Sequence, residues 1–509
     1  MVGMYGNVSI FWRIIEPLDS FVKGFFEVFF MEKKTVLAVD LGAESGRIMA
    51  AHFNGRTLEL TPIHRFANKP MSLNGTLCWN HLELWREIQL GIEKARPYDP
   101  ASIGVDAWGV DFGLLDKQGN LIGNLVQYRD DRTKGMMEKA FAKVGKEAIF
   151  SETGIQFSRI NTLYQLLSMV ESRSPWLEVA DTFLTVPDLF HYFLSGTAVS
   201  EFSIATTTQM LNPQTREWAK DLLSSLGIPT HIFPRIVLPG TRLGQYQNIP
   251  VITPASHDTG SAVAAIPAST PNYAYICSGT WSLVGIEIDQ PIINRAALEA
   301  NATNEGGAYG TIRLLKNIMG LWLVQQCRTT WAQEGNLYNY SDLESLAMTA
   351  PPLVSFVNPN DSIFLPPGDH PKRIHKFCLE TNQLPPQSEG ETIRCILESL
   401  AMAYCDALQK ILGVSGHQVQ VIHMVGGGSK NDLLNQMTAN ATGIPVIAGP
   451  IEASAFGNSI VQLITLGELK NRQEARALIL RMLLVRMYEP KETDEWAEAY
   501  YRYQKIVSR

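Results

Sequence analysis

The alternation of apolar and polar residues changes period along the chain, and its first part predicts three strands. TVLAVD, RIMAAHF and TLELTPIHRF are rich in apolar and β-branched residues and predict strands over 35–40, 47–53 and 57–66. The small-residue loop LGAESG separates the first two strands, and Asn54-Gly55, a strong hairpin signal, precedes the third. The folded part therefore opens as strand, turn, strand, turn, strand.

A helical period follows these strands. The segment HLELWREIQLGIEKA predicts a helix over 81–95. Its apolar residues are expected to lean to one side, and they are Leu82, Trp85, Ile88, Leu90 and Ile92. After the helix, SIGVDAWGVDFGLLD (102–116) predicts another strand that turns back as a hairpin.

The second half of the chain repeats this opening. YAYICSGTWSLVGIEID (273–289) again predicts strand, small-residue loop and strand, and SGTWS stands where LGAESG stood. Two copies of one unit predict two related domains that face a shared cleft. The segment IPASTPN, with its two prolines, places the boundary between Ala265 and Asn272.

The last third predicts alternating helices and strands. Apolar residues at helical spacing predict a helix over 391–413, and Ser388 and Glu391 have capping-box spacing at its start. Further strands are expected over 419–425 and 444–450, and further helices over 429–441 and 453–469.

Composition places the chain among ordinary soluble globular proteins. Its 509 residues predict two to four domains, and 45% of them are apolar and 18% charged. The net charge of −7 gives no basic face for nucleic acid. The six cysteines include no C-x-x-C pair, which argues against a zinc site, and so few suit a reducing cytosol. Cys378 and Cys395 could pair if the fold brings them together, but a role as small buried hydrophobes is favoured.

The first thirty residues differ in character from the rest. FWRIIEPLDSFVKGFFEVFF is rich in aromatic residues, but charged residues interrupt it, so it does not predict a membrane-spanning helix or a signal peptide. Strand patterning starts just after Met31. We therefore interpret residues 1–30 as an extension outside the fold, with a helix on a membrane surface as the less favoured alternative.

Two small-residue loops are candidate phosphate sites. Asp40 ends the first strand, where an acid can hold a hydrated magnesium ion, and the glycines after it let backbone N–H groups turn toward phosphate. Ser278-Gly279-Thr280 occupies the matching place in the second half. Either loop alone is a weak signal, but the pair at equivalent points of two half-repeats is specific.

Two further motifs suggest the rest of a transfer site. Gly426-Gly427-Gly428 lies between a strand and a helix, so a flat ligand can lie against bare backbone beside the free N–H groups of the helix start. Asp258 lies among small residues in ASHDTGSA and can accept the proton of a substrate hydroxyl. The same carboxylate could instead cap the helix that begins near Ser261.

Aromatic and charged residues gather in DAWGVDFGLLD and YRDDRT. A flat apolar wall with paired hydrogen-bonding groups suits a polyol pocket, although surface ion pairs are the alternative interpretation. The sequence contains neither G-x-x-x-x-G-K-[ST] nor G-x-G-x-x-G, and YRD lacks the asparagine and D-F-G of protein kinases. These nucleotide-enzyme classes are therefore set aside.

Taken together, these motifs resemble the FGGY carbohydrate kinases, and within that family those that act on L-rhamnulose. The resemblance covers about residues 36–488 and is carried by DLGAESGR, DAWGVDFGLLD, YRDDRT, ASHDTGSA, SGTWSL, NEGG, LKNIMGLWLVQ, VGGGSKNDLLNQ and AGPIEASAFGN. It implies an α/β fold of two actin-like (ribonuclease H-like) ATPase domains that face a central cleft. It also implies transfer of the γ-phosphate of ATP to the 1-hydroxyl of L-rhamnulose, with Mg²⁺.

The resemblance assigns roles residue by residue. Asp258 matches the catalytic base. The residues that match ATP-binding positions are Ala43, Glu44, Ser45, Gly46, Arg47, Thr280, Gln325 and Gly427. Those that match sugar-binding positions are Gly109, His257, Asp258, Thr259 and Asn317, with Asp130 and Arg132 as an acid–arginine pair near the sugar. The sequence departs from the family at Glu44, where a small hydroxyl residue is more usual.

The expected organisation is therefore an extension (1–30), a sugar-binding domain with the first phosphate loop and the base (31–268), an ATP-binding domain (269–490) and a C-terminal tail (491–509). We expect a cytoplasmic monomer or homodimer that binds a small ketose and neither nucleic acid nor membrane. A kinase of another ketose, such as L-fuculose or xylulose, and a non-catalytic ATP-binding protein of actin-like fold remain alternatives. The presence of both Asp40 and Asp258 disfavours the last.

Overall fold

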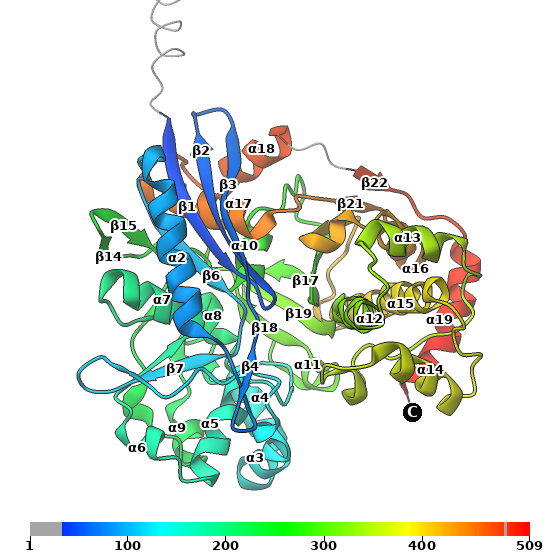
Figure 1. Cartoon of the computed structure of the whole chain (residues 1–509), viewed down its shortest axis with the longest axis horizontal. Coiled ribbons are helices and arrows are strands. Elements are labelled where there is room, and N and C mark those ends of the chain that lie inside the picture. Colours follow the sequence, from blue (N-terminus) through cyan, green and yellow to red (C-terminus); the bar gives the residue numbers. More distant parts are fainter. Residues whose placement is uncertain (1–32, 483–485, 509) are drawn as a thin grey trace, which may run out of the picture.

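The structure is a computed structural model that describes residues 33–482 and 486–508. The predicted extension, residues 1–30, lies outside the described residues. Figure 1 shows two large sheets with helices packed on both.

The first sheet has six strands. β1 pairs antiparallel with β2 and β2 with β3, as the hairpin signals predict, and β1 is parallel to β6 on its other side. The strand order is β14 (Arg242–Tyr246), β15 (Ile249–Ile252), β6 (Ile103–Ala107), β1 (Lys34–Leu41), β2 (Ser45–Phe53) and β3 (Leu58–Ala67).

The second sheet repeats this arrangement. β16 pairs antiparallel with β17 and parallel with β20, as β1 pairs with β2 and β6. The order is β18 (Thr303–Gly306), β19 (Ile312–Met319), β17 (Trp281–Ile288), β16 (Tyr273–Ser278), β20 (Val421–Val425), β21 (Val446–Ala448) and β22 (Arg486–Tyr488). The predicted repeat of the strand–loop–strand unit is therefore confirmed.

Two helices are exchanged between the halves. α17 (Ala453–Leu466), from the second half of the sequence, packs on β1 and β6 of the first sheet. α10 (Asp258–Ala264), from the first half, packs on α17 and contacts β16 of the second sheet. The two helices approach so closely that a Cβ added to Gly457 would lie 1.7 Å from the carbonyl oxygen of Ser261. Glycine is therefore required at this crossing.

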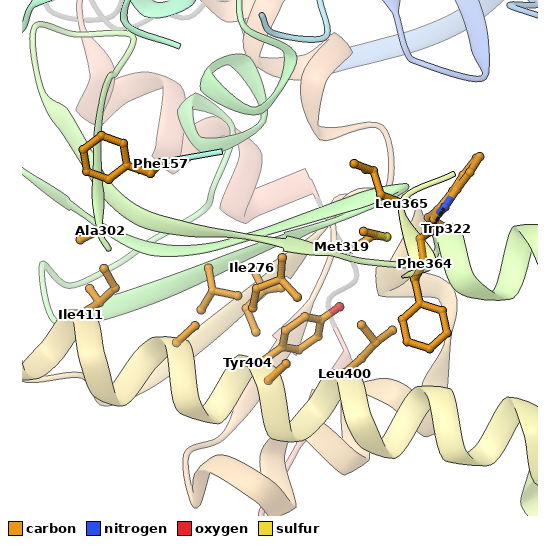
Figure 2. Close-up of a cluster of buried hydrophobic side chains, with 14 of the residues drawn as sticks. Phe157, Ile276, Ala302, Met319, Trp322, Phe364, Leu365, Leu400, Tyr404 and Ile411 are labelled. Carbon is orange, nitrogen blue, oxygen red and sulfur yellow. Dashed lines mark hydrogen bonds between the residues drawn. The ribbon is translucent and has the colours of Figure 1, made fainter. Parts of the chain in front are cut away.

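A long helix forms the core of the second half. α15 (Glu389–Ser415) extends the predicted helix at both ends, and Ser388 caps it by accepting a hydrogen bond from the Glu391 N–H. Figure 2 shows Leu400, Tyr404 and Ile411 of α15 facing the strands of the second sheet. These side chains are buried, and the Tyr404 hydroxyl lies 2.7 Å from Ser282 Oγ of β17.

The buried face of α2 (His81–Ala95) differs from the one predicted. Leu84, Ile88 and Ile92 are buried against the first sheet, whereas Leu82 is 70% exposed and Leu90 38% exposed. The buried residues recur every four positions, which is one stripe of an α-helix. The apolar residues predicted to lie on one face span more of the helix surface than this stripe covers. Leu82 and Leu90 lie outside the stripe and face solvent.

The predicted hairpin over 102–116 does not form. β6 belongs to the first sheet, but β7 pairs with β8 and β9 in a separate sheet. The chain changes direction between β6 and β7 at Val110, whose φ is +70°. The small sheet consists of β7 (Phe112–Leu115), β8 (Leu121–Ile122) and β9 (Thr182–Thr185).

The remaining elements surround these sheets. Beside the first and the small sheet are β4 (Met71–Leu73), β5 (Thr76–Cys78), α3 (Met136–Val144), α4 (Lys146–Thr153), α5 (Thr162–Glu171), α6 (Pro175–Val179), α7 (Val186–Ser195), β10 (Ser200–Glu201), α8 (Phe202–Thr206), β11 (Leu211–Asn212), β12 (Glu217–Trp218), α9 (Lys220–Ser225) and β13 (Ile236–Val237). In the second half are α11 (Arg295–Glu299), α12 (Trp322–Gln333), α13 (Tyr340–Thr349), α14 (His370–Glu380), α16 (Asp432–Thr442), α18 (Arg472–Met482) and α19 (Thr493–Val507).

The region predicted as a C-terminal tail contains α19, whose Trp496 and Tyr503 are buried in the core of the second half. All six cysteines are buried and free, including Cys378 and Cys395. Within the described ranges, no helix has the length and apolar character needed to cross a bilayer.

Candidate active site

A cleft of about 910 Å³ lies where the two halves meet. The loop after β1, the loop between β16 and β17 and the turn after β20 all contribute to its walls, together with the start of α10. The predicted site residues that line it are Asp40, Ala43, Ser45, Arg47, Gly109, His257, Asp258, Thr259, Thr280, Asn317 and Gly427. Residues from both halves of the sequence therefore meet in one cavity.

Five predicted residues lie around the cleft without lining it. Glu44 is exposed at the tip of the first loop, and Gly46 is buried against the Phe66 ring. Gln325 of α12 donates a 3.3 Å hydrogen bond to Thr280 Oγ1 and so supports the second loop. Asp130 and Arg132 lie next to the aromatic residues around Asp111.

Asp111 holds an aromatic cluster beside the cleft. Its carboxylate accepts hydrogen bonds from the indole N–H groups of Trp79 (2.6 Å) and Trp108 (3.0 Å) and from the Gln165 amide (3.2 Å). Burial raises the pKa of Asp111 to about 6, although these donors oppose the shift. Arg132 donates a 2.6 Å hydrogen bond to the side-chain oxygen of the same Gln165. It therefore supports these aromatic residues indirectly, through Gln165.

Asp130 fixes the segment that carries Arg132. One carboxylate oxygen accepts from the Arg132 backbone N–H at 2.9 Å, and the other accepts from the Leu77 N–H at 2.8 Å. Next to it, the Arg129 guanidinium stacks on Trp322 of α12 at 3.9 Å from the ring centroid. Sequence reasoning missed this contact between the two halves, because no local pattern predicts the partner of a buried arginine.

A row of charges crosses the first sheet beside the cleft. Asp40 of β1 has Arg47 of β2 and Asp106 of β6 as its cross-strand partners. Arg47 binds the Asp40 carboxylate at 2.6 Å and Glu452, which precedes α17, at 2.6 Å. Two acids side by side repel each other, and Asn458 of α17 relieves this by donating to Asp106 at 2.6 Å. Burial and the charge of Asp40 raise the pKa of Asp106.

Asp258 is the first residue of α10 and faces the cleft. The Thr259 N–H donates to its carboxylate at 2.6 Å, and His257 Nε2 lies 3.5 Å from the same oxygen. Burial raises the pKa of Asp258 to about 6; the His257 side chain opposes the rise and the Asp40 charge adds to it. The helix-capping interpretation is wrong, because α10 begins at Asp258 itself and its N-cap position is occupied by His257, without a side-chain cap. The Asp258 carboxylate binds the N–H of the next residue and lines the cleft.

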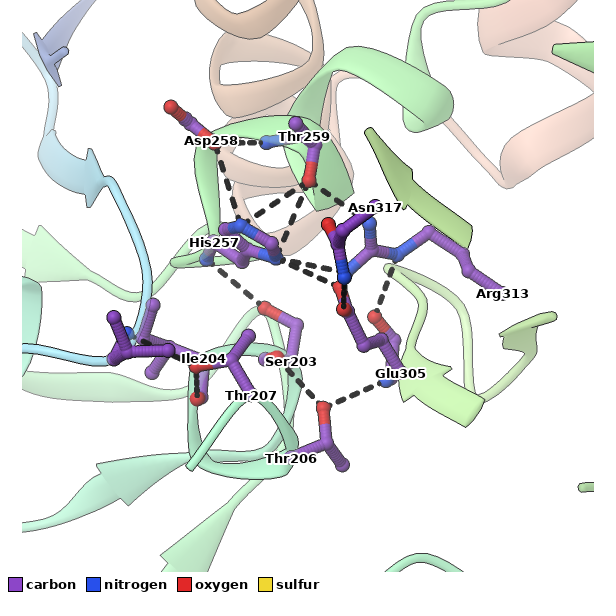
Figure 3. A network of polar contacts seen from close by, with 12 residues as sticks. Ser203, Ile204, Thr206, Thr207, His257, Asp258, Thr259, Glu305, Arg313 and Asn317 are labelled. Carbon is purple, nitrogen blue, oxygen red and sulfur yellow. Dashed lines mark hydrogen bonds and ion pairs between the residues drawn. The ribbon is translucent and has the colours of Figure 1, made fainter. Parts of the chain in front are cut away.

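The turn that carries Asp258 is held from both sides. On one side, Ser203 Oγ accepts from the His257 N–H at 3.2 Å, and the buried Glu201 carboxylate accepts from the N–H groups of Ser203 and Ser256. On the other side lie Glu305 and Arg313 of the second sheet (Figure 3). Sequence reasoning gave neither of these two a role, although NEGG drew attention to the motif around Glu305.

Each of the three glycines after β20 meets a different structural requirement. A Cβ on Gly428 would lie 2.0 Å from Ser278 Oγ, so the turn packs directly on the loop between β16 and β17. Gly426 has a φ of +84°. Gly427 has open space where its Cβ would be and lines the cleft. The triple glycine therefore brings bare backbone to the cavity beside Thr280.

The two related sheets, the paired small-residue loops and the acid between them define a two-domain α/β fold of the actin-like sugar-kinase type. Solved structures agree: gluconate kinase from Lactobacillus acidophilus matches with a TM-score of 0.75 at 17% identity, over 94% of this chain and 98% of that one. Xylulose kinase from Lactobacillus acidophilus matches with a TM-score of 0.73 at 17% identity, over 93% and 98%. At this identity the likeness concerns the fold.

Residues 35–260 match the N-terminal domain, and residues 274–466 the C-terminal domain, of the FGGY family of carbohydrate kinases. The chain belongs to this family. Among its relatives, a rhamnulokinase from Bacteroides thetaiotaomicron is 41% identical over 93% of this chain and 100% of that protein. A rhamnulokinase from Mannheimia succiniciproducens is 42% identical over 90% and 95%.

Proposed function

We propose that this enzyme transfers the γ-phosphate of ATP to the 1-hydroxyl of L-rhamnulose. The observation that carries the proposal is the position of Asp258, a carboxylate in the cleft between phosphate loops from both sheets. Relatives named rhamnulokinase at 41% and 42% identity over most of the chain support the choice of sugar.

In the proposed reaction, the Asp258 carboxylate accepts the proton of the sugar hydroxyl. The hydroxyl oxygen forms a bond to the γ-phosphorus as the bond to the β,γ-bridging oxygen breaks, and ADP leaves. In the first loop, the residues that line the cleft, Ala43, Ser45 and Arg47, would bind the phosphates together with Thr280, and Gly427 would lie against the adenosine. Gly109, His257, Thr259 and Asn317 would orient the sugar.

Magnesium is part of the proposal, with Asp40 as its carboxylate. Asp40 lines the cleft, and the Oδ1 atom of its neighbour Asp106 is buried without a hydrogen-bond partner among the described residues, so the local charge suits a cation. Mg²⁺ usually takes one or two carboxylates together with waters and phosphates. In the part of the chain that is described, no three His, Cys, Asp or Glu residues are arranged as a metal cage. Bound there, the ion would neutralise charge on the transferring phosphoryl group.

A cytosolic location, and a monomer or homodimer as the working form, complete the proposal. The small number of cysteines, six in 509 residues, supports a reducing environment.

The substrate is tested by kcat/KM on four acceptors. We expect L-rhamnulose to exceed L-fuculose, D-xylulose and glycerol by about 10²-fold or more, since each hydroxyl of wrong configuration leaves buried groups unpaired at about 1–3 kcal/mol. L-Fuculose is the strictest comparison, because it differs only in hydroxyl configuration. If L-fuculose or D-xylulose matches L-rhamnulose, the kinase reaction stands and the named sugar is wrong.

The base is tested by the pH dependence of kcat/KM for the sugar. Asp258 must be ionised to accept a proton, and its pKa lies at about 6. Activity should therefore be constant above this pH and fall by about tenfold per pH unit below it. A profile that stays flat down to pH 5, with the protein still folded by circular dichroism, would contradict this assignment.

A further inference from the structure

A buried ion pair lies in the inner wall of the cleft. Glu305 of β18 and Arg313 of β19 are cross-strand partners, with Arg313 Nη2 at 3.1 Å from Glu305 Oε2. The Arg313 side chain is fully buried, and the Glu305 side chain is 4% exposed. Burying two charges costs free energy that an apolar pair would not. Stability alone is therefore a weak reason for this pair.

The pair is joined to the catalytic turn. Glu305 Oε2 lies 3.1 Å from His257 Nδ1, and Arg313 Nη1 donates to Thr259 Oγ1 at 3.0 Å. Figure 3 shows both side chains reaching from the strands of the second sheet to this turn. The pair therefore contacts the residues on both sides of Asp258.

The second oxygen of Glu305 remains available. Glu305 lines the cleft, and within the described residues its Oε1 has one neighbour at hydrogen-bond range, the Asn317 amide at a long 3.5 Å. Burial opposes ionisation of this carboxyl, but His257 and Arg313 outweigh it and hold its pKa below the ordinary value. Glu305 is thus an ionised acceptor with unused lone pairs in the wall of the cavity.

Resting on the sugar-kinase function proposed above, we propose that Glu305 binds the sugar and determines its specificity. Its Oε1 accepts a hydrogen bond from a ketose hydroxyl farther along the carbon chain than the one phosphorylated. The imidazole of His257 lies between the two carboxylates, with Nε2 toward Asp258 and Nδ1 toward Glu305. A sugar whose 1-hydroxyl meets Asp258 therefore extends its later hydroxyls toward Glu305.

This arrangement explains why a charge is placed here. A hydrogen bond to an ionised acceptor is stronger than a neutral one. A ketose with the opposite configuration at that carbon would leave the carboxylate desolvated and unpaired, which discriminates against it. Arg313 keeps the carboxylate ionised and fixed, and through Thr259 it ties the sugar acceptor to the turn of the base.

Glu305→Gln tests the role in binding. We expect kcat/KM for the ketose to fall about 10- to 100-fold, since a charge-assisted hydrogen bond is lost, while KM for ATP stays unchanged. The matched control is Glu287→Gln. Glu287 of β17, in the same sheet as Glu305, forms a buried 2.6 Å ion pair with Arg476 of α18 and does not line the cleft. The Glu287→Gln variant should have a lower melting temperature than the native protein and unchanged kinetics for the ketose.

Glu305→Asp separates recognition from packing. Aspartate keeps the charge beside Arg313 but withdraws the oxygen from the cavity. If Glu305 binds the sugar, the aspartate variant should lose activity toward the ketose by about the same factor as Glu305→Gln. Its melting temperature should equal that of the native protein. If Glu305 only stabilises the fold, aspartate restores the kinetics, and the proposal is overturned.

A thermodynamic cycle that combines substrate analogues with the Glu305→Asp variant identifies the sugar hydroxyl that Glu305 binds. Ketose analogues that each lack one hydroxyl are compared on native protein and on Glu305→Asp. For the partner hydroxyl, removing it and replacing Glu305 should not be additive; additive losses for every analogue would overturn the proposal. The native panel decides the proposed function separately. If another ketose is preferred there, the L-rhamnulose assignment fails, and the cycle on that ketose still decides the role of Glu305.

Discussion

Replacing Asp258 with asparagine is expected to lower the turnover number by about 10²- to 10⁴-fold, the usual contribution of a general base. Asparagine cannot accept the proton of the sugar hydroxyl. It does keep the oxygen that accepts the Thr259 N–H at 2.6 Å, so α10 retains its first turn. The variant should therefore fold and bind ATP with the affinity of the native protein.

The measurement is a coupled assay of ADP release, together with calorimetric titration of ATP and circular dichroism. Asp116→Asn is the matched control. Asp116 lies in an exposed turn, where it accepts from Asn120, and it does not line the cleft. Turnover by Asp258→Asn within a few-fold of the native enzyme would mean that another group accepts the proton.

Replacing Gly457 with alanine is expected to lower kcat/KM by about 10²-fold, although Gly457 lies in α17 and makes no contact with substrate. The added Cβ would lie 1.7 Å from the Ser261 carbonyl oxygen, so α10 and α17 must move apart. Asp258 begins α10 three residues before Ser261 and moves with it. A misplacement of about 1 Å at a reacting group can cost about 10²-fold in rate, and overpacking costs about 1–3 kcal/mol of stability.

Gly413→Ala is the control for this substitution. Gly413 is also helical, in α15, and a Cβ there would have no heavy atom within 4 Å. Alanine should be neutral or stabilising at this position, since it lowers the entropy of the unfolded chain. Thermal melts and steady-state kinetics on both variants decide the matter. If Gly457→Ala keeps the native kcat/KM, the crossing of α10 and α17 does not set the position of the base.

The sequence predicted the repeated unit and several of the residues that line the cleft. Strand patterning and the Asn54-Gly55 signal depend on neighbours in the chain, and β1, β2 and β3 form as expected. The loops after β1 and after β16 stand at equivalent points of the two sheets. Asp40 and Asp258 could be singled out because each is an acid among small residues at the end of an element.

Other features could not be predicted from local pattern. Leu82 and Leu90 are apolar and at helical spacing, yet they face solvent, because the sheet covers only the stripe of Leu84 and its neighbours. The hairpin expected over 102–116 fails at Val110, where the chain turns with a positive φ and β7 joins another sheet. Both outcomes depend on which distant surface is available for burial.

The sequence by itself thus determined most of the strands and helices, the two half-repeats, and the small-residue loops and the acid that line the cleft. These features depend on residues that are close together in the chain. Only the tertiary structure decided that α17 covers the first sheet, and that Glu305 and Arg313 reach the turn of Asp258. Such contacts join residues about fifty to several hundred positions apart. They depend on close packing and on the burial of charge, which neighbouring residues in the chain do not specify.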